Sequence, residues 1–565
     1  MKTKIIGIIT FLLISSACQK DFLTRLPQDE FTDETYWTSE DKVRTFAYGF
    51  YPTYFPGYAA GFDLSWGGFF SGQSLNDDFA PTSPAAFVSI VPPNGGGWSF
   101  SWVRKANIMI NRIQGVPMEE EAINNWTGVA RFFRAMEYAN LVKRFGDMPW
   151  YDKEMDESDP ELYRPRDPRT FVMDKVLEDF KYAVEHVRES DPAVGPDGLI
   201  VNRDVVLAIM SRVFLFEGTY LKYHDIDQAK ATEYLKEAKW AANELITGGK
   251  YQIADDYRGL FSSEDLSNNP EIIMFRQYNT SQVTHSLMSY VNREGQTGVS
   301  KDLIDAYLAE DGLPIEVSGL YQGDKSIEEV MADRDPRMHD TFVQELRLGG
   351  EVTNPSTSGI SVHKFLNEAL KDAPEGLSSQ NITDAPEIRY GEVLMNYIEA
   401  TAELGSVSQN DLDISINVLR DRADVQLPHL QVMGGQPAVD GMAYDDPKRD
   451  PTVDPLLWEI RRERRIELAM EGFRYDDLRR WKKLEYADYD TRSDINRGAW
   501  IIKAEHPDMA NVTLEGGGDE GYIRPAAPQA YRIFDNPRVY LYPLPLDQIK
   551  LYSDNGVELT QNPGW

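Results

Sequence analysis

The chain has very few of the residues that form disulfide bonds and metal sites. Its 565 residues include one cysteine and seven histidines. A single cysteine excludes an intramolecular disulfide and a cysteine-rich zinc site, so a hydrophobic core has to hold the protein together. The histidines form no His-Glu-x-x-His helix, and the sequence has no Gly-x-Ser-x-Gly elbow and no phosphate-binding loop. These absences argue, although not strongly, against an enzyme.

Positive charge is also scarce. The chain carries 91 acidic and 58 basic residues, which gives a net charge of −33. A field of this sign repels nucleic acid and anionic lipid headgroups, so we expect no nucleic-acid partner. We attribute the acidity to solubility at a crowded cell surface rather than to capture of a ligand by acidic groups. The aromatic content of 12% is sufficient for a large core.

The apolar run near the N-terminus is short. It covers residues 5–14, follows two lysines and precedes small residues and Cys18, whereas a helix that crosses a bilayer needs about 20 apolar residues. This order is typical of a secretory signal peptide, and a cysteine directly after the cleavage point is similar to a bacterial lipoprotein acylation site. Ser15 stands where that pattern usually has leucine. We predict a signal peptide over residues 1–17, lipidation at Cys18 and a tether over 18–35.

Apolar residues recur at the helical period of about 3.6 in four segments of the N-terminal half. The first ends at Gly146, the third begins near Asp204, which we take as its N-cap, and the fourth ends at Gly248-Gly249. The segments are Val129 to Phe145, Phe171 to Val187, Val205 to Tyr220 and Ala229 to Leu245. Helices of this length with short connectors predict a mainly α fold of tetratricopeptide-like helix pairs that form an αα-superhelix.

The second half has longer irregular segments. Residues 250–385 contain short apolar runs between Gly, Pro, Asn and Ser, which predicts loops and small strands. Helical spacing returns at 393–404, 416–423 and 456–481, with a Gly/Pro-rich loop at 433–455. We therefore expect one helical body with long loop-rich insertions and minor β structure, because long loops in compact domains are usually functional or disordered.

The last of these helices is rich in charge of both signs. Its glutamates alternate with its arginines at helical spacing, which favours internal ion pairs over a nucleic-acid surface. We therefore expect Glu467→Ala to lower thermal stability more than ligand affinity. The residues concerned are Glu463, Glu467, Glu471, Arg461, Arg464 and Arg465.

Sugar recognition requires flat apolar faces beside carboxylate, amide or guanidinium groups. Such residues occur outside helical periodicity in one early region. Trp98 follows three glycines, which predicts a loop tip. The alternative for the aromatic residues is core packing, and for Asp77 and Asp78 it is a turn or a helix cap. The region contains Trp66, Phe69, Phe70, Asn76, Asp77, Asp78 and Trp98.

Adjacent acids also occur at Asp77-Asp78 and at Asp476-Asp477. Glycoside hydrolysis needs two carboxyl groups about 5 to 9.5 Å apart across one bond, and adjacency in sequence does not establish that geometry. A further cluster, Asp488, Asp490 and Asp494, consists of oxygen ligands that suit calcium, but it lacks the order of an EF-hand loop. We assign no catalytic residue, no metal ligand and no cofactor.

Seven segments stand out in order along the chain: Asp21-Phe22-Leu23 with Pro27, Asn107 to Ile113, Ala130 to Pro149, Asp311 to Ile315, Arg334 to Arg337, Ile460 to Trp481 and the ending Leu559-Thr560-Gln561-Asn562-Pro563-Gly564-Trp565. Taken together, they resemble the SusD/RagB family of outer-membrane nutrient-binding lipoproteins. The resemblance extends from Cys18 to the last residue, and no single segment would establish it.

The resemblance implies a single helical body over residues 36–565, with an N-terminal part at about 36–225 and a C-terminal part at about 270–565. It implies sugar contacts in the early loop region and in a second region before Asp311-Gly312-Leu313-Pro314. That correspondence is loose at the level of single residues. The second region contains Tyr278, Tyr290 and Arg293. Core packing is again the alternative for the two tyrosines.

The function implied is that of a lipid-anchored protein on the surface of the outer membrane. It would capture an oligosaccharide and pass it to a SusC-like TonB-dependent transporter, with no chemistry on the sugar. Three alternatives stay open: a RagB-like protein that captures peptides, a surface glycosidase, and a purely structural support of the transporter complex. The sequence does not identify the glycan.

Overall fold

The computed structural model describes residues 36–58, 75–156, 158–191, 193–405 and 407–565. The predicted signal peptide, Cys18 and the tether lie outside the described residues, as do Trp66, Phe69 and Phe70.

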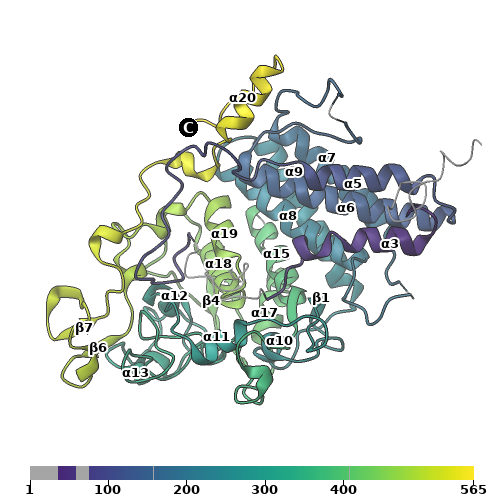
Figure 1. Ribbon diagram of the computed structural model, residues 1–565. Helices are drawn as coiled ribbons and strands as arrows, with labels where there is room; N and C mark the ends of the chain where they lie inside the picture. The colour runs from purple at the N-terminus through teal and green to yellow at the C-terminus, as the bar shows by residue number, and fades with distance from the viewer. Residues whose placement is uncertain (1–35, 59–74, 157, 192, 406) are drawn as a thin grey trace, which may run out of the picture.

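The N-terminal half is a stack of helices (Figure 1). Neighbours in the sequence are neighbours in space: α5 packs on α6, α6 on α7 and α8 on α9. The helices are α3 (Glu40–Tyr48), α4 (Tyr51–Tyr54), α5 (Ser101–Ile113), α6 (Glu120–Phe145), α7 (Arg169–His186), α8 (Arg203–Tyr223) and α9 (Gln228–Gly248). The four helices predicted from the apolar periodicity correspond to α6, α7, α8 and α9.

The ends of these helices have identifiable causes. The helix α6 ends where predicted because Gly146 has a φ of +78°, which glycine adopts without the steric cost of a Cβ. The helix α8 begins differently from the prediction. Its N-cap is Asn202, whose side chain accepts a hydrogen bond from the Val205 N–H, and Asp204 lies inside the first turn. Asn202 and Asp204 both have side chains that can cap a helix, and only the backbone conformation decides which of them does so.

The middle of the chain consists of short elements, as predicted. The strands β1 and β2 pair in antiparallel fashion with shifts in register, and β2 leads directly into the next long helix. The elements are α10 (Gly259–Ser262), β1 (Ile272–Arg276), α11 (Leu287–Arg293), α12 (Lys301–Ala306), α13 (Ile327–Met331), α14 (Pro336–Thr341), η2 (Pro374–Gly376) and β2 (Ala385–Arg389).

Two helices of the C-terminal half, α15 and α19, join the two halves of the molecule. The helix α15 packs against α8, α9 and α18, and α19 packs against α8 (Figure 1). The predicted helix at 456–481 is interrupted between Glu467 and Arg474. The helices are α15 (Tyr390–Glu403), α16 (Gln409–Asp413), α17 (Ile416–Arg420), α18 (Pro455–Glu467) and α19 (Arg474–Arg480).

The segment predicted as a loop at 433–455 begins with a small sheet. Its order is β3 (Gln431–Met433), β4 (Gln436–Val439) and β5 (Met442–Ala443). Gly434-Gly435 and Asp440-Gly441 connect the strands, and all four residues have positive φ. This is the backbone conformation of two-residue type I′ hairpin turns, for which Gly-Gly and Asp-Gly are favoured sequences.

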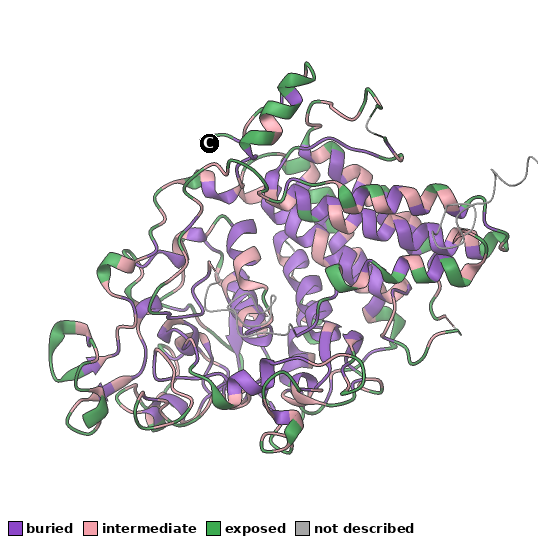
Figure 2. Cartoon of the chain, viewed as in Figure 1, coloured by how far each residue is buried: buried purple, intermediate pink, exposed green. Residues whose placement is uncertain are grey.

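After α19 the chain is mostly irregular. It contains short 3-10 helices, one two-stranded antiparallel sheet and a final helix that is exposed along much of its length (Figures 1 and 2). The elements are η3 (Leu484–Ala487), η4 (Ser493–Asn496), β6 (Trp500–Ile502), η5 (Pro507–Met509), η6 (Glu515–Gly517), β7 (Glu520–Tyr522), η7 (Pro528–Ala530), η8 (Pro537–Tyr540) and α20 (Leu546–Asp554).

The largest hydrophobic core runs through the helical stack and includes side chains from Val43 to Leu559. A second core lies under the short elements of the middle part. Figure 2 shows buried residues concentrated inside the helical stack and exposed residues on the outer faces of helices, on α20 and at loop tips. The prediction of a mainly α fold with helix pairs and minor β structure is confirmed. Every helix in the described residues is too short or too polar to span a membrane.

Candidate functional site

The three polar residues predicted as early sugar contacts are buried. Asn76, Asp77 and Asp78 are 5%, 1% and 4% exposed. Both oxygens of Asp77 accept hydrogen bonds from Arg474 at 2.7 Å, and Asp78 accepts one from Arg465 at 2.9 Å. The two aspartates therefore hold the early segment against α18 and α19, and Asp77 also lines a cavity.

Trp98 does not lie at an exposed loop tip. The glycines before it do form a turn, with positive φ at Gly95, Gly96 and Gly97. The indole itself is only 6% exposed and makes edge contacts with Phe100 and Phe145, at ring centroid distances of 5.5 and 5.3 Å. The prediction of exposure is wrong because the turn directs the ring into the core, where a large aromatic side chain buries the most apolar area.

The residues of the second predicted region also fail to form one site. Tyr278 and Tyr290 are buried core residues. The Tyr278 hydroxyl donates to the Tyr58 carbonyl at 2.7 Å, and the Tyr290 hydroxyl accepts from the Thr297 N–H at 3.2 Å. Arg293 is exposed and pairs with Asp372 at 3.1 Å. Core packing, the alternative for the two tyrosines, is what the structure shows.

Asp77 lines a cavity of about 410 Å³, which we call the ionic cleft. Its walls come from α12, α18, the start of α19, η3, η4 and the loop 446–451. A recess of about 60 Å³ adjoins it and adds Arg461 and Trp481 to the lining. The lining residues include the acids Asp77, Asp302, Asp305, Glu316, Asp446, Asp450 and Asp494, the bases Lys448, Arg449, Arg462, Arg465, Arg474 and Arg492, and the aromatic residues Trp458 and Tyr486.

The helix α18 presents three of these side chains to the cleft. Trp458, Arg462 and Arg465 are spaced four and three residues apart, which places them on one helix face. The Trp458 indole N–H donates to Asp446 at 3.1 Å, and Arg462 pairs with the same carboxylate. Trp458 is half-buried, so part of its ring remains available to a ligand.

Two further side chains of the cleft, Lys448 and Tyr486, differ in how far they are exposed to solvent. Lys448 is 58% exposed and pairs with Glu316 at 2.5 Å. Tyr486 is half-buried and donates its hydroxyl to Asp450. Burial raises the pKa of Asp450, but hydrogen bonds from Lys483 and Tyr486 outweigh it and hold that pKa below its usual range.

The inner wall is a network of buried ion pairs. Arg465 binds Asp302 at 2.8 Å in addition to Asp78, and Arg492 binds Asp302 at 2.6 Å. Burial raises the pKa of Asp77, yet the charges of Arg465 and Arg474 outweigh it and lower the pKa below its ordinary value. Asp77 therefore stays ionised at neutral pH and is unsuited to donate a proton as a general acid.

The other pair of adjacent acids, Asp476 and Asp477, is also held by basic side chains. Asp476 binds Lys143 at 2.6 Å, and Asp477 accepts hydrogen bonds from Arg464 and Arg480 at 2.9 Å. Asp488 of the calcium candidate accepts backbone hydrogen bonds instead, including one from the Asp490 N–H at 2.7 Å. Among the residues that the structure describes, no group of three His, Cys, Asp or Glu side chains is placed to hold a metal ion.

Sequence reasoning missed most of the ionic cleft. Trp458 was part of an apolar helix pattern, and nothing in a single sequence shows which apolar positions of a helix stay half-exposed. Two signals were present. Asp302 and Asp305 directly precede the Asp311-Gly312-Leu313-Pro314 motif, and the long loop before α18 indicated a functional surface.

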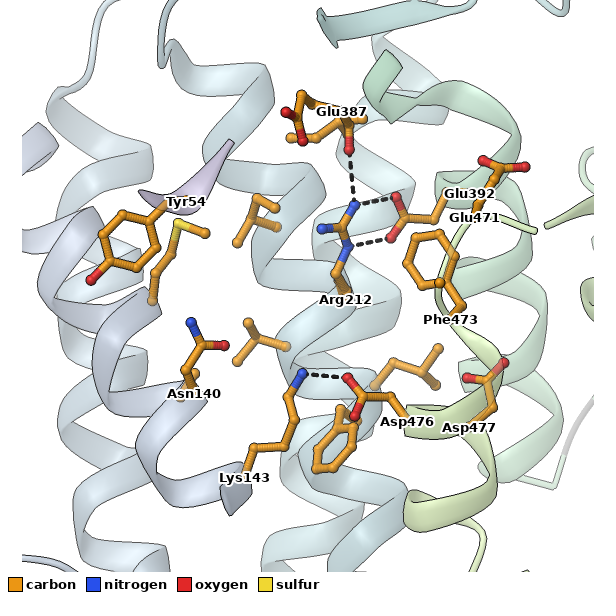
Figure 3. Close-up of a pocket in the computed structure, with 18 of the residues that line it drawn as sticks. Tyr54, Asn140, Lys143, Arg212, Glu387, Glu392, Glu471, Phe473, Asp476 and Asp477 are labelled. Carbon is orange, nitrogen blue, oxygen red and sulfur yellow. Dashed lines mark hydrogen bonds and ion pairs between the residues drawn. The ribbon is translucent and has the colours of Figure 1, made fainter. Parts of the chain in front are cut away.

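A second cavity of about 310 Å³ lies between the N-terminal helices and elements of the C-terminal half, and we call it the interlayer pocket (Figure 3). The helices α4, α6 and α8 form one wall, and β2, the segment Glu471–Phe473 and α19 form the other. Figure 3 shows Lys143 paired with Asp476 across the pocket and Arg212 paired with Glu392.

Glu387 on β2 has a raised pKa in this pocket. Burial raises the pKa of its carboxyl to about 8, although the Gly57 N–H and Arg212 oppose the rise. A carboxyl with a raised pKa binds its proton more tightly in the folded chain, so stability decreases as pH rises from about 4.5 to about 8. Glutamine cannot ionise, so we expect Glu387→Gln to remove this decrease in the free energy of unfolding. The decrease is on the order of 2 kcal/mol once solvent screening is taken into account.

The measurement is urea unfolding of both proteins at pH values of about 5 and about 8. Glu178→Gln, at an exposed position of α7, serves as the control and should keep the pH dependence of the parent protein. A Glu387→Gln variant with the same pH dependence as the parent protein would contradict the raised pKa.

Comparison with known proteins gives the family. The model of the SusD family matches residues 270–565, which is more than half of the chain. A curated relative, a SusD-like protein of Bacteroides ovatus, is 24% identical over 288 residues, and the alignment covers 49% of this chain and 50% of the relative. The chain thus aligns with about half the length of that protein.

Solved structures share the fold. A SusD-like carbohydrate binding protein from Bacteroides fragilis superposes with a TM-score of 0.68 at 19% identity, covering 92% of this chain and 99% of that one. The surface glycan-binding protein A from Bacteroides fluxus superposes with a TM-score of 0.58 at 18% identity, covering 94% and 100%. The resemblance inferred from the seven segments is confirmed, and the chain belongs to the SusD family.

Proposed function

We propose that this protein is a lipid-anchored surface protein that binds an oligosaccharide in the ionic cleft and passes it unchanged to a SusC-like TonB-dependent transporter of the outer membrane. Membership of the SusD family supports the role in glycan uptake. Relatives of the same fold carry the descriptions carbohydrate binding protein and surface glycan-binding protein. The signal-like N-terminus and Cys18 support the lipid anchor.

The composition of the ionic cleft is the main evidence for a sugar as the ligand. Its acids and bases nearly balance and are held in ion pairs, so the cleft as a whole has little net charge to attract an ion. Sugar hydroxyls both donate and accept, and therefore suit a wall on which carboxylates alternate with guanidinium groups. Trp458 and Tyr486 supply aromatic faces for the C–H surface of a sugar ring.

The principal test is calorimetric titration of the purified protein against plant, host and microbial polysaccharides and against mixed peptides. We expect Trp458→Ala to weaken glycan binding by about tenfold or more, since loss of a stacking aromatic face costs about 1.4 kcal/mol or more. Trp240→Ala is the matched control, because this half-buried tryptophan lies on α9 and does not line the cleft.

Each other outcome contradicts part of the proposal. Binding of peptides alone would favour a peptide-capturing protein. Shortened products from purified protein would show a glycosidase. No binding across the panel would favour a structural role in the transporter complex. Glycan binding that Trp458→Ala leaves unchanged would keep the ligand class and reject the ionic cleft as its site.

A further inference from the structure

Two cations of the interlayer pocket, Arg212 and Lys143, keep unused hydrogen-bond donors that face the cavity. The Nε and Nη2 atoms of Arg212 each donate to Glu392 at 2.6 Å. The Nη1 atom has no partner in the part of the chain that the structure describes. Figure 3 shows this nitrogen turned away from Glu392 and toward the side of the pocket where Tyr54 lies. Arg212 therefore offers a charged donor to the cavity.

A second set of donors comes from α6. Lys143 donates to Asp476 at 2.6 Å, which uses one of the three N–H groups of its ammonium. Asn140 lies three residues earlier, on the same face of the helix, and its exposed side chain has no hydrogen-bond partner among the described residues. Figure 3 shows both side chains projecting from α6 into the pocket.

The acids of the pocket do not offer matching acceptors. Glu392 and Asp476 are held by the two cations just described. Glu471 accepts hydrogen bonds from Arg389 and Lys364, and Asp477 accepts from Arg464 and Arg480. Glu387 is protonated at neutral pH, because its pKa is raised to about 8 by burial, and it adds a further donor.

Apolar side chains form part of the remaining lining, beside Arg389, Arg464 and Arg480, which are paired with buried acids. Met136, Ile209 and Val213 contribute aliphatic surface, and the Phe473 ring packs 5.1 Å from the Arg212 guanidinium. A volume of about 310 Å³ suits a small ligand. The ligand that fits has an acceptor-rich group for the donors of Arg212, Lys143 and Asn140 and a compact body with an apolar face.

We propose that the interlayer pocket binds the carboxylate of an acidic sugar, with Arg212 Nη1 and Lys143 Nζ as its donors. A carboxylate forms stronger hydrogen bonds to guanidinium and ammonium groups than a neutral hydroxyl does. The acidity of the whole chain does not prevent this, because salt screens exposed charges beyond about 8 Å. The choice of a sugar rests on the proposed function, whereas the carboxylate rests on the pocket alone.

The experiment compares galacturonic acid with galactose, which differ only in a carboxylate in place of a hydroxymethyl group. Titrated into the purified full chain, galacturonic acid should bind about tenfold or more tightly than galactose, and Lys143→Gln should remove most of that difference. Lys175→Gln is the matched control, because Lys175 lies on the outer face of α7 and pairs with Glu178. If Lys143→Gln unfolds, Asn140→Ala, at an exposed position, should weaken galacturonic acid binding about threefold.

Three results would overturn the inference: equal affinity for the two sugars, no binding of galacturonic acid, or a preference that Lys143→Gln leaves intact. A preference lost in Trp458→Ala and kept in Lys143→Gln would place the carboxylate in the ionic cleft and also overturn it. The proposed function is judged separately, since it depends on oligosaccharide binding that Trp458→Ala weakens and Lys143→Gln does not change.

Discussion

Replacing Glu467 by alanine is expected to lower the free energy of unfolding by about 3 to 5 kcal/mol, because it leaves buried cations without their partner. Glu467 is fully buried. One carboxylate oxygen accepts hydrogen bonds from Arg389 at 2.7 Å and Arg422 at 3.1 Å, and the other accepts one from Arg337 at 2.9 Å. These arginines come from three different elements or loops, so the change loosens the C-terminal half as a whole.

The measurement is urea or thermal unfolding, with Glu178→Ala as control. Glu178 forms an exposed pair with Lys175 on α7, and its loss should cost less than about 0.5 kcal/mol. Glycan affinity at a temperature where both proteins are folded should not change, because Glu467 does not line the ionic cleft. Equal melting temperatures for the parent protein and Glu467→Ala would contradict the role assigned to this carboxylate.

The same site predicts acid sensitivity. Burial raises the pKa of Glu467, but the charges of Arg389, Arg422 and Arg337 outweigh it and lower the pKa to about 2. A carboxyl with a lowered pKa contributes stability that is complete above about pH 4.5 and is lost as the pH falls toward 2. Glu467→Ala should therefore unfold with a weaker dependence on pH in this range.

Replacing Trp98 by alanine is expected to cost about 3 to 5 kcal/mol of stability without changing the glycan affinity of the folded protein. The indole fills a buried position against Phe100 and Phe145, and its removal leaves a cavity that the surrounding helices cannot fill. Trp98 lines neither the ionic cleft nor the interlayer pocket.

Two measurements together check this result. Unfolding experiments should rank Trp98→Phe between the parent protein and Trp98→Ala, because phenylalanine restores part of the buried ring. Calorimetry below the lowest melting temperature should give the same dissociation constant for all three. If Trp98→Ala instead lost affinity and kept its stability, Trp98 would be a ligand contact and not a core residue.

The sequence was sufficient for most of the helices because their causes are local. The apolar spacing from Val129 to Phe145 and the glycine after it specify α6 and its end, whatever the helix packs against. The prediction was less accurate where two local signals compete, as at Asn202 and Asp204. It also joined α18 and α19 into one helix, because the apolar pattern continues across the break between Glu467 and Arg474.

The candidate site was predicted only in part. Of the residues predicted in the early region, Asp77 does line the ionic cleft. Trp98 was predicted on the surface but is buried, because residue type does not show which way a ring points after a turn. Trp458, the aromatic residue on which the proposed function depends, lies 381 positions after Asp77 in the chain, and only the packing of α18 against the early segment brings them to one cavity.

The charged segment 456–481 shows most clearly what the sequence determines and what the tertiary structure decides. The sequence by itself determined that the helix is stabilised by ion pairs, that the body is mainly helical and that the chain resembles the SusD family. The partners of those charges were predicted within the helix, but most lie elsewhere: Glu467 binds Arg337, Arg389 and Arg422. Helical spacing specifies which side chains share a face. What that face contacts depends on segments hundreds of residues away, and burial makes those contacts strong, so only the tertiary structure decided them.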